Sequence, residues 1–98
     1  MIIRIVKLTL QPDKVGDFLV HFDQFKTAIR AAHGCQLLEV YQDKANEAVF
    51  FTYSYWNEEN DLELYRKSET FGQVWPYAKS LFAAPAEAWT VERKMQVV

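Results

Sequence analysis

The sequence has 98 residues and a formal net charge of −2 at neutral pH, from 11 basic and 13 acidic residues. This length fits a single domain, which we expect to span residues 1–98. No run of basic residues appears, so the charge pattern argues against a nucleic-acid-binding protein. No apolar run approaches the roughly 20 residues that a membrane-spanning helix needs, which argues against a membrane role.

Half of the residues are hydrophobic and 15% are aromatic, a heavy share for a small domain. We therefore expect an interface or a ligand cavity in addition to the core. Cys35 is the only cysteine, which rules out an internal disulfide and predicts a reducing, cytoplasmic location. His21 and His33 are the only histidines, and no Cys/His spacing indicates a metal site, so we expect neither a metal nor a cofactor.

The first predicted element is a strand from Ile2 to Leu10, with apolar residues on both faces. Residues 11–13 end the strand, and Asp13 is placed to cap a helix. An amphipathic stripe follows at helical spacing, made of Val15, Phe18, Leu19, Phe22, Phe25, Ile29 and Ala32. Gly34 is the predicted left-handed residue that closes this helix.

Two further strands come next, joined by a polar hairpin loop at residues 43–47. The first runs from Cys35 to Gln42. The second, from Val49 to Trp56, is rich in aromatic and β-branched residues and is the predicted central strand. Its alternation places Val49, Phe51, Tyr53 and Tyr55 on one face and Phe50, Thr52, Ser54 and Trp56 on the other. Neither face suits water, so we expect a second copy of the chain to cover the face that the helices leave bare.

The last part of the chain contains two helical stretches and a final strand. Asn57 is predicted to cap the first stretch, whose opening turn is acidic, and Ser68 to cap a restart. Pro76 lacks a backbone donor, so we expect a kink or a break just before it. The final strand is predicted from Ala86 to Val97.

The predicted order of elements is therefore strand, helix, strand, strand, helix, strand. This is the order of the ferredoxin-like βαββαβ fold, an α+β architecture in which a four-stranded antiparallel sheet carries both helices on one face. The bare face of the sheet would meet its counterpart in a second copy. We therefore expect a homodimer that forms through the sheet faces.

Several stretches resemble a known protein family. They are a short first strand, an amphipathic helix that ends at Gly34-Cys35, and a strand that ends in Tyr53-Ser54-Tyr55-Trp56. The segments at residues 57–62 (Asn-Glu-Glu-Asn-Asp-Leu) and 68–71 (Ser-Glu-Thr-Phe) match as well. Together they resemble the antibiotic biosynthesis monooxygenase domain of the dimeric α+β barrel superfamily, over nearly the whole chain.

The resemblance implies a homodimer with facing sheets and, in each subunit, a pocket between the sheet and the helices. Members include small oxygenases that oxidise polycyclic phenols, anthrones or quinols without metal or flavin, and a branch that degrades haem. The haem-degrading branch uses an Asn, a Trp and a His where this chain has Val6, Tyr65 and Trp75, so the axial histidine is missing. Quinol-oxidising members carry His near Tyr65 and near Thr70, and neither position is His here.

Tyr65 and Trp75 match the family's pocket positions. The resemblance makes Tyr65 a hydrogen-bonding catalytic group and Trp75 a pocket wall whose N–H can also donate. Simple packing of both side chains in the core is the alternative interpretation, because aromatic stripes on helices are usually core. The complete predicted substrate-binding set is Trp75, Arg4, Val6, Phe22 and Phe71.

Three polar side chains remain to be placed. His21, at the edge of the first helical stripe, is predicted either to act as a general base at the pocket rim or to be partly exposed without a role. Arg4 lies on a strand face with Val6 and Leu8, where it either holds a phenolate or carboxylate or pairs with a nearby acid. His33 adjoins the helix end and is expected to interact with the helix dipole.

Two functions fit these residues. The first is a cofactor-independent monooxygenase that oxidises a small aromatic substrate, such as a quinol or an anthrone, with O2. That chemistry requires an apolar pocket, aromatic walls and one or two polar groups that stabilise a phenolate. The second is a non-catalytic dimeric module of the same fold that binds a small molecule or acts in a stress response, which the missing histidines favour. Haem binding is a third possibility.

Overall fold

The computed structural model describes all 98 residues. Its elements in chain order are β1 (Ile2–Thr9), the 3-10 turn η1 (Pro12–Lys14), α1 (Val15–Arg30), β2 (Cys35–Gln42), β3 (Val49–Trp56), α2 (Glu59–Arg66), α3 (Glu69–Ser80) and β4 (Glu87–Val91). The strands form one antiparallel sheet in the order β2-β3-β1-β4. The predicted ferredoxin-like α+β fold is thereby confirmed. No helix combines the length and apolar content that crossing a membrane requires.

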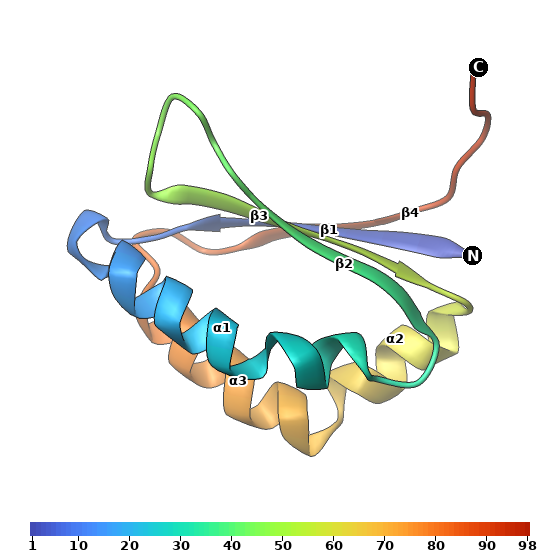
Figure 1. Cartoon of the computed structure of the whole chain (residues 1–98), viewed down its shortest axis with the longest axis horizontal. Helices are drawn as coiled ribbons and strands as arrows, with labels where there is room; N and C mark the ends of the chain where they lie inside the picture. The colour runs from blue at the N-terminus through green and yellow to red at the C-terminus, as the bar shows by residue number, and fades with distance from the viewer.

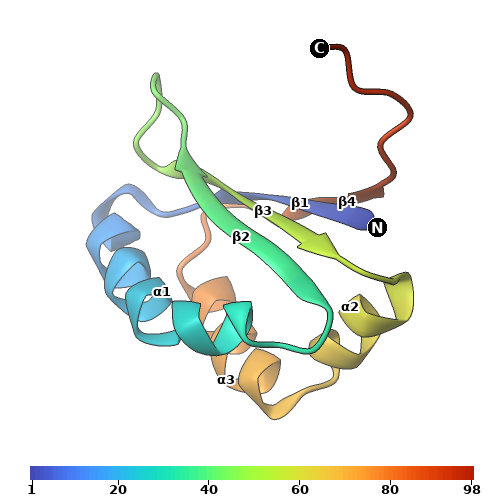
Figure 2. The same ribbon diagram turned by 45° about the vertical axis from the view of Figure 1, so that its right-hand side comes forward.

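The three α-helices form one layer against one face of the sheet, and the opposite face is bare (Figure 1 and Figure 2). The β2–β3 loop and the C-terminal segment after β4 both extend on the bare side, away from the helices (Figure 1). We call the face that contacts the helices the inner face and the bare one the outer face.

The strand register decides which side chains lie on each face, because direct antiparallel partners point to the same side. Arg4 pairs with Ser54 on the inner face, next to a second inner pair, Val6 with Thr52. On the outer face, Ile5 lies between Tyr53 of β3 and Trp89 of β4. The other outer residues of the three strands are Ile3, Lys7, Thr9, Val49, Phe51, Tyr55, Glu87 and Val91. Most of the outer face is therefore apolar or aromatic, although no layer of this chain covers it.

The layer between the sheet and the helices is densely packed at its two ends. One buried cluster consists of Leu8, Leu10, Phe18, Phe50 and Leu81. The other consists of Cys35, Trp56 and Leu62. Trp56 is only 1% exposed, and burial of a large apolar side chain contributes about 1.5–3 kcal/mol. The middle of the layer, between these clusters, is not filled.

Two of the predicted helix caps are wrong. Asp13 lies inside η1, where Pro12 has already set a helical backbone, and no side chain caps η1 or α1. Asn57 belongs to the turn after β3, because its N–H donates to the Gly34 carbonyl at 2.8 Å. Glu58 takes the N-cap position of α2 instead.

The other two predicted helix ends are confirmed. The Ser68 hydroxyl oxygen accepts a hydrogen bond from the Phe71 N–H at 3.2 Å and so caps α3. Gly34 has a φ of +82°, the left-handed conformation expected after α1, although the helix itself ends at Arg30.

The C-terminal part differs from prediction in two places. The helical stretch is interrupted between α2 and α3, at Ser68, and not before Pro76. The helix α3 runs through Pro76 without interruption. The helix tolerates Pro76 because the carbonyl that loses its donor belongs to exposed Gly72 and can bond to water. β4 ends at Val91 rather than Val97, because Val91 already pairs with Ile3 and β1 offers almost no further partner.

Candidate active site

A cavity of about 330 Å³ lies between the inner face of the sheet and the helices. Fifteen of its 19 lining residues are hydrophobic, as is usual for a small-molecule site. The inner residues of β3 explain the hollow. Phe50 and Trp56 fill the two buried clusters, whereas the smaller Thr52 and Ser54 between them leave space that Ala78 of α3 does not fill.

We infer from the exposure of the lining residues that the mouth of the cavity lies between the end of α2 and β4. Of all the lining residues, only Arg66 and Ala88 are exposed to solvent. The rest are buried or half-buried. A ligand can therefore enter beside the last turn of α2.

Aromatic side chains form a continuous row that begins at the end of β3 and follows α2 and α3. Consecutive ring centroids are separated by 5.3 Å for Trp56–Tyr65, 5.4 Å for Tyr65–Phe71, 5.7 Å for Phe71–Trp75 and 5.6 Å for Trp75–Phe82. Phe71 and Trp75 are stacked with an interplanar angle of 13°. All of these rings except Phe82 line the cavity, so the row offers planar faces to an aromatic ligand.

Tyr65 is the polar group of this row. Burial, followed by the proximity of the Cys35 thiol, raises the pKa of Tyr65 to about 12. Its hydroxyl is therefore protonated throughout the neutral range and acts as a hydrogen-bond donor, not as a base. Opposite it, the Trp56 Nε1–H donates to the Ser54 hydroxyl oxygen at 3.0 Å, which leaves the Ser54 proton free for a ligand.

Arg4 and Arg66 are the only charged side chains that line the cavity. Arg4 is half-buried, and its Nη1 donates to the Thr90 hydroxyl at 2.9 Å. Burial, and then the nearby charge of Arg66, lower the pKa of Arg4, while Glu63 opposes this shift. Arg66 forms an exposed ion pair with Glu63 at 3.3 Å. One end of an otherwise apolar cavity is therefore cationic.

His21 does not lie at the pocket rim, and that prediction is wrong. Its side chain is buried between α1 and α3, where its ring packs on Phe25 and Tyr77. Nε2 lies 2.9 Å from the carbonyl oxygen of Val74. Since a carbonyl only accepts hydrogen bonds, Nε2 carries the proton and donates a hydrogen bond to the Val74 carbonyl of α3. His21 is not among the residues that line the cavity.

The structure also bears on metal and haem. His33 is exposed, with Nε2 3.7 Å from Asp61 Oδ1. No three His, Cys, Asp or Glu side chains gather as a metal-binding group. No histidine lines the cavity, so its residues do not fit the axial haem ligation of the haem-degrading branch.

Of the seven predicted site residues, all but His21 meet around this one cavity. They are Arg4 and Val6 from β1, Phe22 from α1, Tyr65 from α2, and Phe71 and Trp75 from α3. Their roles remain predictions. Sequence reasoning missed Arg66, which belongs to no apolar stripe, and the pair Thr52 and Ser54. The large-small-small-large order of the inner residues of β3 is a signal that predicts the hollow.

Comparisons with known proteins agree with this architecture. The sequence model of the antibiotic biosynthesis monooxygenase family matches residues 1–75. No curated protein sequence matches the chain significantly. Among solved structures, a conserved protein from Methanosarcina mazei Go1 is similar with a TM-score of 0.89 and 23% identity, over 96% of this chain and 94% of that one.

Two further solved structures share the fold. One described as an antibiotic biosynthesis monooxygenase has a TM-score of 0.90 and 14% identity, over 95% of this chain and 98% of that one. A Mycobacterium tuberculosis protein has a TM-score of 0.88 and 15% identity, over 99% and 98% of the two chains. At these identities the structures show the fold alone, whereas the family match extends over most of the sequence. The chain therefore belongs to the antibiotic biosynthesis monooxygenase family.

Proposed function

We propose that this protein is a cofactor-independent monooxygenase that oxidises a small phenolic aromatic substrate with O2. The observation that carries the proposal is the cavity itself, which combines an aromatic wall, a protonated Tyr65 and a cationic end. Family membership supports the general reaction class.

The proposed reaction needs no electrons beyond those of the substrate. In an anthrone-type substrate, the enol form loses its phenolic proton to water and gives a phenolate whose charge is delocalised onto a ring carbon that keeps one hydrogen. That carbon then forms a C–O bond with O2. The O–O bond of the resulting peroxide breaks as the second C–H proton leaves. One oxygen atom remains as the new carbonyl and the other leaves as water, so one CH2 and one O2 give one C=O and one H2O.

The residues of the cavity suit the demands of this reaction. Phe71 and Trp75 provide flat apolar surfaces that hold the ring and exclude water. Tyr65 donates a hydrogen bond to an oxygen on which negative charge develops, in an interior where such bonds are strong. Arg4 lowers the pKa of a bound phenol by favouring its charged form.

The cavity contains no side chain that titrates as a base near neutral pH. Its lining includes no His, Asp, Glu, Lys or Cys. The substrate must therefore lose its phenolic proton to water at the mouth, helped by the cationic end. The same lack of a base favours the second candidate, a non-catalytic binding module of this fold.

Oxygen uptake distinguishes the two candidates. Purified protein is incubated under air with a panel of quinols and anthrones, and O2 is followed with an electrode, with heat-denatured protein and added chelator as controls. The proposal expects uptake that survives the chelator and disappears on denaturation. Absence of uptake across the panel would leave the binding module as the better account.

Variants then test the assigned roles. Tyr65→Phe removes one donor to the developing charge and should lower kcat by about a hundredfold. Trp75→Ala should also strongly reduce turnover, because it removes a wall of the cavity. Tyr77→Phe is the matched control, since Tyr77 packs on His21 and does not line the cavity. Wild-type turnover in both cavity variants would refute these assignments.

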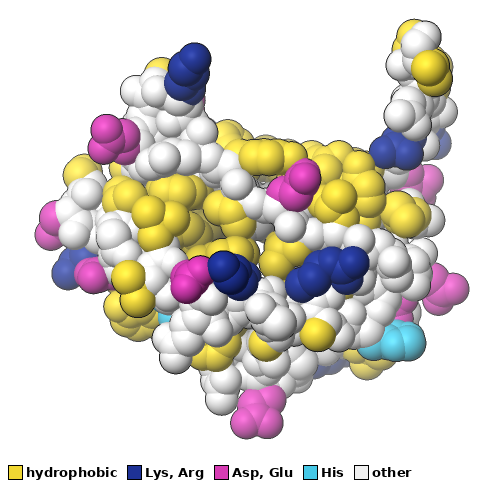
Figure 3. Space-filling model, viewed as in Figure 1, with side chains coloured by type: hydrophobic (Ala, Val, Ile, Leu, Met, Phe, Trp, Pro, Cys, Tyr) yellow, Lys and Arg dark blue, Asp and Glu magenta, His cyan; other side chains and the backbone are white.

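We further propose that two copies associate through their outer faces. In the space-filling view, hydrophobic side chains gather at the level of the sheet between two projections, the β2–β3 loop and the C-terminal segment (Figure 3). Trp89 and Val91 of β4 are 46% and 38% exposed on this face. A second sheet would cover these side chains, and the homodimer implied by the family resemblance would do so symmetrically.

A further inference from the structure

The charges of the cavity lining are of one sign. Arg4 and Arg66 line it, and no acidic side chain does. The other polar lining residues, Thr52 and Ser54, are uncharged. A neutral hydrocarbon ligand would leave Arg4 without a counter-charge.

Arg4 is the more informative of the two. Its side chain is half-buried, and its hydrogen-bond partner is the neutral hydroxyl of Thr90. No carboxylate lies within ion-pair distance of it. A guanidinium that is partly removed from water and lacks an anionic partner is costly, and an anion bound beside it would offset this cost.

Arg66 is close enough to reinforce Arg4. Both arginines line the same cavity, and Arg66 pairs with Glu63 at 3.3 Å, so the three groups carry a net charge of +1. The Arg66–Glu63 pair is exposed and joins residues three apart on α2. Exposed pairs of this kind are weak, so an arriving anion can displace Glu63 from Arg66.

We propose that the cavity takes a planar aromatic anion, with its anionic oxygens between Arg4 and Arg66 at the mouth and its rings against Phe71 and Trp75. Arg66 is exposed, whereas Phe71 and Trp75 are half-buried in the same cavity, so one ligand bound there can contact both. The proposal names the substrate class of the site and rests on the proposed function for the identity of that site. The anionic group is either a carboxylate substituent or the phenolate itself.

Isothermal titration calorimetry with three matched probes tests this proposal without any turnover. The probes are 2-naphthoate, which is anionic, its neutral isostere 2-naphthamide, and 2-naphthol. We expect 2-naphthoate to bind about tenfold or more tightly than 2-naphthamide, as one or two charge-assisted hydrogen bonds allow. Added NaCl should weaken 2-naphthoate binding and leave 2-naphthamide binding unchanged.

Arginine variants locate the anion. Arg66→Gln, at an exposed position, should reduce the affinity for 2-naphthoate by about tenfold and leave that for 2-naphthamide unchanged. Arg4→Gln should act in the same direction, with circular dichroism as the check on its fold. Lys79→Gln removes an equal charge from an exposed part of α3 that does not line the cavity, and is the matched control.

The two sources of the anionic group differ in proton release. 2-Naphthol that binds as phenolate releases a proton, so its apparent binding enthalpy changes with the ionisation enthalpy of the buffer, whereas that of 2-naphthoate does not. Proton release by 2-naphthol together with a preference for 2-naphthoate would assign the cationic end to either group. A preference for 2-naphthoate without such release would assign it to a carboxylate.

Equal affinities for 2-naphthoate and 2-naphthamide, or a preference that survives both arginine substitutions, would overturn the proposal. So would failure of all three probes to bind. These outcomes are independent of the oxygen-uptake experiment. Turnover without anion preference would refute only this proposal, and anion preference without turnover would refute only the monooxygenase.

Discussion

The side chain of Asp61 occupies the space beside Gly34 in which a Cβ would stand. Gly34 is also the only residue with a positive φ, at +82°. Its carbonyl accepts a hydrogen bond from the Asn57 N–H at 2.8 Å. These contacts hold the turn after α1 against the start of α2, the helix that carries Tyr65 and Arg66 to the cavity.

Gly34→Ala should therefore be strongly destabilising. A left-handed backbone costs an L-residue roughly 1–2 kcal/mol, and overlap with Asp61 adds roughly 1–3 kcal/mol. We expect the free energy of unfolding to fall by about 3 kcal/mol, measured by urea denaturation followed by circular dichroism.

Two other glycines provide matched controls. A Cβ on Gly16 or on Gly72 meets no atom within 4 Å, and both residues lie in helices. Gly16→Ala and Gly72→Ala should raise the free energy of unfolding by about 0.5–1 kcal/mol. If Gly34→Ala behaved as these two do, the contact with Asp61 would not be tight.

Much of the fold could be predicted because local patterns determine it. The aromatic and β-branched run from Val49 to Trp56 predicts both ends of β3 correctly. The Ser68 hydroxyl caps a helix, and Gly34 adopts the left-handed conformation that follows one, so both residues mark helix ends in the sequence. β4 was predicted too long because its length depends on β1, its distant partner. Pro76 predicts a kink or a break just before it, but whether the helix is interrupted depends on whether the freed carbonyl has access to water.

The site was predictable in part for a similar reason. The family resemblance indicated Tyr65 and Trp75, and helical spacing placed Phe22 and Phe71 on the same side as the core. The His21 side chain points toward α3 and not into the cavity. Its orientation depends on how α1 packs against α3, which the spacing of residues within α1 does not predict. The sequence does not predict that Arg66 lines the cavity, because this depends on where the end of α2 lies relative to Arg4 on β1.

Tyr65 should make stability depend on pH in the alkaline range. Its pKa is raised to about 12 in the folded protein, against 10 for an ordinary tyrosine. Between these values the unfolded chain loses the proton and the folded chain keeps it, so stability falls as pH rises. The stabilising contribution is complete below pH 10 and is lost by about pH 12, with a magnitude of about 2 kcal/mol.

The Tyr65→Phe variant isolates this contribution, because other groups titrate in the same range. Urea denaturation at pH 9, 10 and 11 should show a steeper loss of stability for wild type than for Tyr65→Phe. Parallel curves for the two proteins would mean that burial does not raise the pKa of Tyr65.

His21→Leu should affect stability more than oxygen uptake. The substitution removes the buried hydrogen bond to the Val74 carbonyl, at a cost of about 1 kcal/mol. Thermal unfolding should shift downward, while uptake per folded molecule should stay near that of wild type. Loss of uptake from folded His21→Leu protein would restore His21 as a catalytic candidate.

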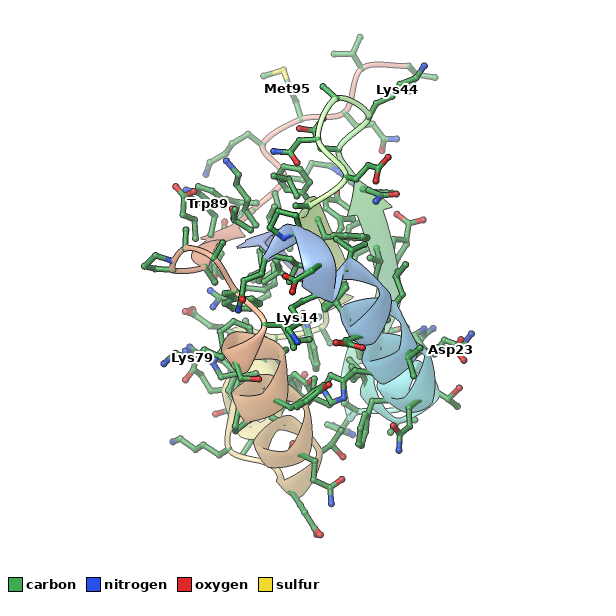
Figure 4. The ribbon with its side chains drawn as sticks, turned by 90° about the vertical axis from the view of Figure 1, so that its left-hand side faces the viewer. Lys14, Asp23, Lys44, Lys79, Trp89 and Met95 are labelled. Atoms are coloured by element: carbon green, nitrogen blue, oxygen red, sulfur yellow. The ribbon has the colours of Figure 1, made fainter.

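Trp89→Lys should prevent the proposed dimer. Trp89 lies on β4, and Met95 and the loop residue Lys44 lie beyond the sheet on the side away from Asp23 and Lys79 of the helices (Figure 4). A lysine at position 89 would place a charge among Ile5 and Tyr53, and burying it against a second sheet is unfavourable. Light scattering after size exclusion should give a dimer for wild type and a monomer for Trp89→Lys.

Val20→Lys is the control for this experiment. Val20 is 72% exposed on α1 in the helical layer, so the substitution should leave the dimer intact. A monomeric wild type, or a dimer that Val20→Lys disrupts and Trp89→Lys does not, would move the interface away from the outer face.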